Sequence, residues 1–197
     1  NQERDAYCDN VVVVNMDDQI SAYCAIEKLV QNEHRNILYI GCKKPRLPAI
    51  RRNEGVRLAV EKWQHKIEKM TEIDCDFSEE KAYQEIYRMY SSSTADKPTG
   101  IFAANDVMAI GAISALKDLG YDIPKDVSVI GFDDITVSKY LTPGLTTMRC
   151  NFDKIASMSV NSLINLIEQK DTVRHVEVPV EYIERGTLAK AGKIQKI

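Results

Sequence analysis

The feature that most constrains the fold of this chain is a repeated alternation of short apolar runs with longer segments of helical periodicity. Apolar, β-branched runs occur at 11–14, 37–41, 70–75, 100–104, 127–132, 145–148 and 176–183. Between them, apolar residues recur at helical spacing in 20–30, 53–66, 78–90, 106–119 and 155–167. Continuous apolar strands separated by helices are typical of a mostly parallel sheet that is covered on both faces. The sequence therefore predicts an α/β fold with right-handed crossovers.

Capping signals support several of these helices. Ser78 stands before two glutamates, which favour the positive N-terminus of a helix. Asn105 is a natural N-cap for the helix after the 100–104 strand, and Gly120 stands where a left-handed C-cap is expected. The segment 43–52 carries five basic residues and no acid, and we expect it to be a loop.

Composition narrows the class of protein. The 197 residues are 44% hydrophobic and carry a net charge of -3, which predicts one globular domain or two small lobes and excludes a disordered tail. A mildly acidic balance argues against a domain whose main task is to grip a phosphate backbone. No uncharged stretch approaches the roughly 20 residues of a spanning helix, and no export signal is visible, so we expect a cytoplasmic protein without a membrane partner. The five cysteines form no CxxC pair, which favours reduced thiols over a disulfide or zinc framework.

Polar residues that directly follow predicted strands are the first candidates for a site, because ligands of open α/β sheets bind beyond the carboxyl ends of the strands. These candidates are Phe77, Asn105, Asp106, Asp133, Asp134 and the basic segment 43–52. We expect them to converge on one edge of the sheet.

Each candidate has a purely structural alternative. Asn105 can serve as an N-cap alone, and Phe77 can be a core aromatic. Asp133 and Asp134 can form an Asx turn, or hold Mg²⁺ if further acidic ligands gather there. The basic segment can be a solvated loop or a nucleic-acid contact.

Motifs of enzyme chemistry are missing. The chain has no GxGxxG, GxxxxGK[ST], HExxH or GxSxG pattern, and its three histidines have no evident nucleophile as a partner. We therefore expect a binding protein rather than an enzyme, with no catalytic residue, metal or cofactor.

Three motifs in order carry a resemblance to a known family. The segment 101–152 contains the patterns AxNDxMAxGA, IPxDVSVIGFDD and PxLTT. Upstream HRNILYIG (34–41) and RRNEGVRLAV (51–60), and downstream VPVEYIERGT (178–187), extend the similarity. The chain resembles the effector domain of LacI/GalR-family transcription regulators over residues 11–187.

The resemblance implies a type I periplasmic-binding-protein-like fold, in which two Rossmann-like lobes joined by three crossovers close on a small molecule. It implies an N-terminally truncated form in which the carboxyl-side lobe is nearly complete. Residues 1–15 would be a remnant of the amino-side lobe with a crossover strand, and 16–148 the effector-binding lobe. Residues 149–175 would be a crossover and a helix of the amino-side lobe, and 176–197 the return strand and tail.

The resemblance also assigns roles to residues that match the family pattern. Arg52 would reach ligand oxygens, Phe77 would stack on a sugar face or nucleobase, and Asp133 would accept hydrogen bonds from hydroxyls. Asn105 would also contact the ligand, Met16 would line the crossover, and Cys150 replaces a residue that is commonly polar. We expect Arg52→Ala and Asp133→Ala to abolish effector binding and to leave the melting temperature nearly unchanged.

The function implied is that of a ligand-sensing and dimerisation domain of a LacI-type regulator, most simply a repressor. A sugar-like effector would bind between the lobes and control operator binding by a homodimer, through a helix-turn-helix domain absent from this chain. The first alternative is an extracytoplasmic sugar-binding protein of a transport system, which shares the fold. The second is a nucleotide-sugar or phosphosugar enzyme built on a Rossmann lobe.

Overall fold

The computed structural model describes residues 11–93 and 96–192. These residues divide into two compact units, one made of 11–17 with 150–181, and a larger one made of 18–149 with 182–192. Each unit is described separately.

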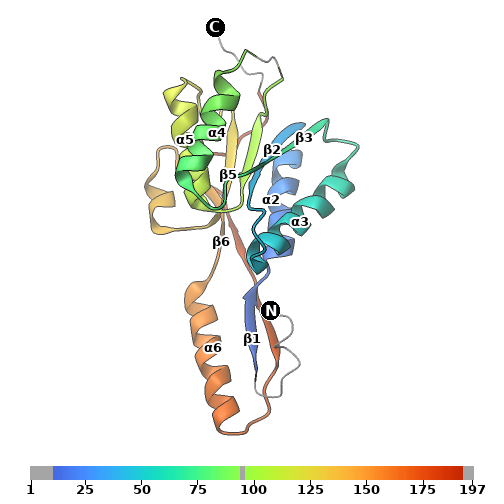
Figure 1. Ribbon diagram of the computed structural model, residues 1–197, viewed down its shortest axis with the longest axis vertical. Helices are drawn as coiled ribbons and strands as arrows, with labels where there is room; N and C mark the ends of the chain where they lie inside the picture. Colours follow the sequence, from blue (N-terminus) through green and yellow to red (C-terminus); the bar gives the residue numbers. More distant parts are fainter. Residues whose placement is uncertain (1–10, 94–95, 193–197) are drawn as a thin grey trace. The chain divides into compact units, whose positions relative to one another are not determined.

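The larger unit is built on a six-stranded sheet in the order β3-β2-β4-β5-β6-β8 (Figure 1). Its strands are β2 (Asn36–Gly41), β3 (Lys69–Asp74), β4 (Gly100–Ala103), β5 (Ser128–Asp133), β6 (Thr146–Arg149) and β8 (Glu181–Ile183). The pairs β2–β3, β2–β4, β4–β5 and β5–β6 are all parallel. Every residue of β2 and β4 is buried, which explains their continuous apolar sequence.

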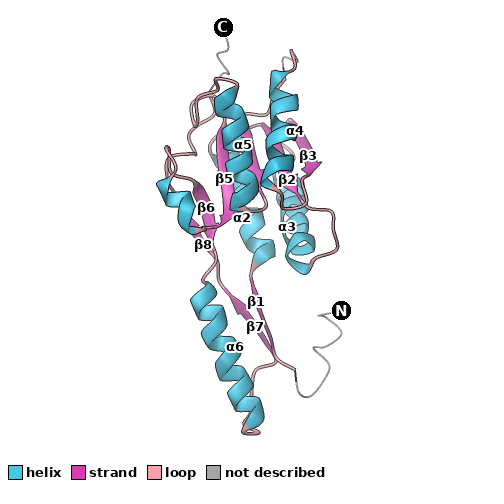
Figure 2. Cartoon of the chain, turned by 60° about the vertical axis from the view of Figure 1, so that its left-hand side comes forward, coloured by secondary structure: helices cyan, strands magenta, loops and turns pink. Residues whose placement is uncertain are grey.

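Four helices and one short 3-10 helix surround this sheet. The helices are α2 (Asp18–Gln31), α3 (Leu47–Trp63), α4 (Glu79–Ser91) and α5 (Asp106–Asp118), and the 3-10 helix is η1 (Thr136–Tyr140). Helix α2 packs with α3, and α4 packs with α5, so the two faces of the sheet each receive one pair (Figures 1 and 2). The predicted α/β class with a parallel sheet is confirmed.

The order of the strands reverses direction between β2 and β4. After β2 the chain moves outward to β3, whereas after β4 it moves the other way to β5. Ligands of open α/β sheets bind in the crevice at such a switch point, outside the carboxyl ends of the strands.

Two boundaries differ from the expectation. Helix α3 begins at Leu47, so the end of the basic segment is helical and Arg52 lies on a helix rather than in a loop. The expected strand 176–183 is divided into two strands that belong to different sheets, β7 (His175–Val178) and β8.

The packing of α2 against α3 depends on Gly55. A Cβ at this position would lie 2.0 Å from the backbone oxygen of Gln19 on α2, so the two helices approach as closely as a glycine allows. We expect Gly55→Ala to lower the free energy of unfolding by about 2 kcal/mol, because the helices must separate. Chemical denaturation of the variant measures the loss. Glu54→Ala, at an exposed position of the same helix, is the control and should change stability by less than about 0.5 kcal/mol.

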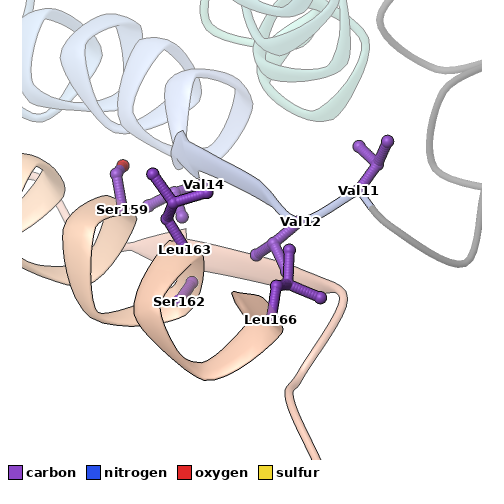
Figure 3. Close-up of a pocket in the computed structure, with 7 residues that line it drawn as sticks. All are labelled: Val11, Val12, Val14, Ser159, Ser162, Leu163 and Leu166. Atoms are coloured by element: carbon purple, nitrogen blue, oxygen red, sulfur yellow. The ribbon is translucent and has the colours of Figure 1, made fainter. Parts of the chain in front are cut away.

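The smaller unit consists of a parallel pair, β1 (Val13–Met16) with β7, and helix α6 (Phe152–Ile167). Helix α6 contacts β1, yet none of its 16 residues is buried. A pocket of about 230 Å³ lies between α6 and the segment that contains β1, and Figure 3 shows Val12 and Val14 facing the leucines of α6 across it. Its lining residues are Val11, Val12, Val14, Ser159, Ser162, Leu163 and Leu166.

Candidate ligand-binding site

The larger unit brings most of the predicted site residues to the carboxyl ends of its central strands. Asn105 follows β4, Asp133 ends β5, and Phe77 follows β3. Arg52 reaches the same edge from α3. These four residues therefore surround the switch point of the sheet.

Arg52 is the centre of this arrangement. Its guanidinium is buried and donates from Nε to Asp18 Oδ1 at 2.7 Å and from Nη1 to the carbonyl oxygen of Ala104. A third bond runs from Nη2 to Asp133 Oδ1 at 3.3 Å. The guanidinium carbon lies 3.6 Å from the centroid of the Phe132 ring, which adds a cation–π contact. Arg52 is thus held rigidly between α2, β4 and β5.

Asp133 is the more accessible member of the Arg52–Asp133 pair, because 22% of its side chain is exposed against 5% of that of Arg52. Burial raises the pKa of the Asp133 carboxyl to about 6, although the neighbouring Arg52 acts in the opposite direction. A carboxylate that is oriented by an arginine and still reaches solvent can accept hydrogen bonds from ligand hydroxyls.

Two of the predicted site residues have a strained backbone conformation with positive φ. Phe77 has φ 58° and Asp133 has φ 107°, both in the left-handed region that non-glycine residues rarely adopt. Their neighbours Asp76 and Asp134 are left-handed as well, with φ 52° and 55°. Such strain concentrates at functional sites, and the two strained pairs follow β3 and β5 at the same edge of the sheet.

Asn105 has a structural task in this structure. Its Oδ1 accepts a hydrogen bond from the backbone N–H of Met108 at 2.9 Å, which caps helix α5. The expected N-cap role of Asn105 is therefore confirmed. A ligand contact by its amide group stays a prediction.

Asp106 holds the loop that follows β5. Its buried carboxylate accepts hydrogen bonds from Ser138 Oγ at 2.5 Å, Thr147 Oγ1 at 2.6 Å and the backbone N–H of Ile135 at 2.9 Å. Burial raises its pKa, and these three hydrogen bonds oppose the rise. A Cβ at Gly131 would lie 2.2 Å from Asp106 Oδ1, so the glycine leaves room for this carboxylate. Asp106 thereby fixes the loop that begins with Asp133.

Asp134 fastens the same loop to two other segments. It forms ion pairs of 2.7 Å with Arg149 at the end of β6 and with Arg185 after β8. Its side chain is only 8% exposed, and burial works against its ionisation. The two arginines outweigh burial and hold its pKa below the usual range. Asp133 and Asp134 therefore face different partners, Arg52 for the first and Arg149 and Arg185 for the second.

The remaining two predicted residues belong to the smaller unit. Met16 ends β1 and is half-buried, and Cys150 follows β6 and is buried. Their proposed contact with a ligand stays a prediction. Sequence reasoning missed Asp18, the carboxylate at the start of α2 that pairs with Arg52, since an acidic residue in a first helical turn has an ordinary explanation.

Within residues 11–93 and 96–192, no group of three or more histidine, cysteine, aspartate or glutamate side chains could hold a metal ion. No helix among these residues is both long enough and apolar enough to cross a membrane.

Comparisons with known proteins agree with this geometry. The model of the family described as "Periplasmic binding protein-like domain" matches residues 26–188. The transcriptional repressor PurR of Mannheimia succiniciproducens is 31% identical over 169 residues, which are 85% of this chain and 50% of that repressor. PurR of Serratia proteamaculans is 30% identical over 168 residues, or 85% of this chain and 49% of the relative. The chain thus spans about half the length of these curated relatives.

Solved structures show the same fold. A LacI-family transcriptional regulator from Enterococcus faecium with bound ribose has a TM-score of 0.84 at 26% identity. The match covers 94% of this chain and 68% of that structure. The dimeric Lac repressor with an 11-residue C-terminal deletion has a TM-score of 0.82 at 25% identity, over 91% of this chain and 64% of the repressor.

Proposed function

The chain belongs to the periplasmic binding protein-like domain family and is an effector-binding domain of the LacI-family type. From this we propose that it senses a sugar-like effector and controls DNA binding. The observation that carries the proposal is the Arg52–Asp133 pair at the switch point of the sheet. The similar regulator from Enterococcus faecium contains ribose, and the curated relatives are transcriptional repressors, which favours regulation over transport or catalysis.

The chemistry of this edge suits a polyol. Asp133 would accept hydrogen bonds from hydroxyl groups, with Arg52 holding its carboxylate in place. Phe77 would cover an apolar face of the sugar ring, and its strained backbone supports a role beyond packing. Asn105, Met16 and Cys150 would complete the binding residues. This set offers no nucleophile paired with a base, so it supports binding without turnover.

The smaller unit would be part of a second lobe. Helix α6 leaves large apolar side chains in solvent, and its packing against β1 leaves the pocket of Figure 3 open. Exposed fractions are 54% for Phe152, 56% for Leu163 and 72% for Ile167, far more than an independent domain leaves uncovered. A complete second lobe would bury this face. The effector would then shift the relative orientation of two lobes in a cytoplasmic homodimer and alter operator binding.

The proposal is tested by a panel of sugars, with ribose as the first probe. A ligand that binds the native state raises the melting temperature, and calorimetry then gives its affinity. We expect Asp133→Asn to weaken binding of the bound sugar 10- to 100-fold, since a hydrogen bond to a charged group contributes roughly 1.5–3 kcal/mol. Glu61→Gln, at an exposed position of α3, is the control and should bind like the wild type. Equal affinity of Asp133→Asn and the wild type would refute the assignment of the site.

A further inference from the structure

A cluster of positive charge lies at the carboxyl end of β2, beside the proposed sugar site. It consists of Lys43, Lys44 and Arg46, which precede α3, and Lys81 on α4. We call these four residues the cationic cluster. All four side chains are exposed, so their charged groups can meet a ligand from solvent.

Two carboxylates near this cluster, Asp74 and Asp76, are already engaged. Asp76 pairs with Lys44 and lies 3.7 Å from Lys81 Nζ. Asp74 Oδ1 accepts from the backbone N–H groups of Lys43 and Asp76, each at 3.2 Å. The Lys44 hydrogen bond holds the pKa of Asp76 below its usual range, and Arg46 is close enough to act in the same direction. Glu72 is a third carboxylate nearby and lines a small pocket with Lys43.

Two members of the cluster form no direct ion pair within the described residues. Among residues 11–93 and 96–192, Lys43 and Arg46 form no ion pair. Helix α3 begins directly after Arg46 with no side-chain cap and no acidic residue in its first turn. The partial positive charge of this helix end thus has the same sign as the surrounding side chains. An anion could therefore pair directly with Lys43 and Arg46 at this helix end.

The strand order places this charge within reach of the sugar site. The cluster follows β2, whose neighbours in the sheet are β3 and β4. Phe77 follows β3, Asn105 follows β4, and Asp133 ends β5, one strand farther. A ligand whose hydroxyls lie at Asp133 and whose ring lies toward Phe77 therefore passes the carboxyl end of β2. At the carboxyl ends of the strands, the part near Asp133 on β5 therefore suits ligand hydroxyls, and the part after β2 suits an anion.

We propose that the cationic cluster binds the anionic group of the effector, and that the effector is a phosphate monoester of a sugar. The inference rests on the proposed function and names its ligand class. Lysines provide compact charges for a phosphate dianion, and Arg46 can add a bidentate contact. A DNA contact is less suited to this place, because four cations at one edge of the sheet do not form the broad basic face that binds a duplex.

The test uses calorimetry on the 197-residue chain to compare the affinity of each sugar with that of its phosphate ester. The two pairs are ribose with ribose 5-phosphate, and glucose with glucose 6-phosphate. We expect at least one ester to bind 10-fold or more tightly than its parent sugar. The preference should shrink between 50 and 200 mM salt, because the charges are exposed. In the double variant Lys43→Gln, Arg46→Gln the ratio of the two affinities should fall close to one. The control Arg57→Gln, Lys62→Gln removes two exposed charges from the far turns of α3 and should keep the full ratio.

The outcomes separate this inference from the proposed function. Sugars that bind as tightly as their esters leave the sensor function standing and overturn the anion site. An ester preference that survives in the double variant overturns the assignment to Lys43 and Arg46. If no sugar and no ester binds, both proposals fail. A second arm measures a 20-base-pair DNA duplex by fluorescence anisotropy, and DNA binding that the double variant abolishes, without any ester preference, would assign the cluster to DNA instead.

Discussion

Arg52→Ala is expected to lower the free energy of unfolding by about 3–5 kcal/mol. Removing one partner of a buried ion pair leaves the other charge without compensation. In this structure, the change removes the 2.7 Å ion pair between Arg52 Nε and the carboxylate of Asp18, which is 5% exposed. The carbonyl oxygen of Ala104 and the face of the Phe132 ring also lose their contact with the guanidinium. Urea denaturation of the variant and the wild type measures the difference.

The matched control is Arg57→Ala, on the same helix. The side chain of Arg57 is 63% exposed and lies 3.5–3.6 Å from the carboxylates of Glu54 and Glu61, so its loss should change stability by less than about 1 kcal/mol. A loss of less than 1 kcal/mol in Arg52→Ala as well would contradict the buried network. The earlier expectation that Arg52→Ala leaves the melting temperature nearly unchanged is thus replaced, because it treated Arg52 as a ligand contact alone.

The strands of the larger unit, apart from β8, could be predicted from the sequence to within one or two residues. Buried parallel strands exclude polar residues from both faces, so β2, β4 and β5 read as continuous apolar runs. The start of α3 could not be predicted in this way. Its first turn contains Pro48 and follows a row of basic residues, a pattern that resembles a loop although proline is well tolerated at a helix N-terminus.

The candidate site was predictable only where a strand end identifies a residue. Asp133 and Asn105 directly follow apolar runs, so their place at the edge of the sheet follows from the pattern. The partnership of Arg52 with Asp18 joins two helices that are 34 residues apart in sequence, and no local pattern encodes it. The left-handed backbone of Phe77 was equally hidden, because aromatic residues disfavour that conformation.

The second large effect is a pH dependence of stability that depends on His34. This histidine is buried, with Nδ1 3.0 Å from Thr99 Oγ1 and Nε2 3.0 Å from the carbonyl oxygen of Ala189. Burial lowers its pKa from 6.5 to about 4. In the unfolded chain His34 is therefore protonated below about pH 6.5, whereas in the folded chain it is protonated only below about pH 4. The stability contribution of neutral His34 is present above pH 6.5 and is lost as the pH falls toward 4, by about 3 kcal/mol in all.

Asp133 has the opposite dependence in an overlapping pH range. Its folded pKa of about 6 lies above the ordinary value of 3.8, so the folded chain keeps a proton there that the unfolded chain has lost. That contribution is present below pH 3.8 and is lost as the pH rises through about 6. Around pH 5 the two groups change the stability of the wild type in opposite directions, by about 1.4 kcal/mol per pH unit each. If the free energy of unfolding of the wild type depends little on pH in this range, the opposite contributions of His34 and Asp133 can be the reason.

Two variants separate these contributions when urea denaturation is followed from pH 4.5 to 6. Relative to the wild type, His34→Gln should lose stability as the pH rises, and Asp133→Asn should gain stability, each by about 1.4 kcal/mol per pH unit. The slope is the readout, so a uniform destabilisation of either variant does not affect the result. His65→Gln, which changes an exposed histidine, is the control and should run parallel to the wild type. Parallel profiles for all four proteins would show that neither His34 nor Asp133 changes its pKa on folding.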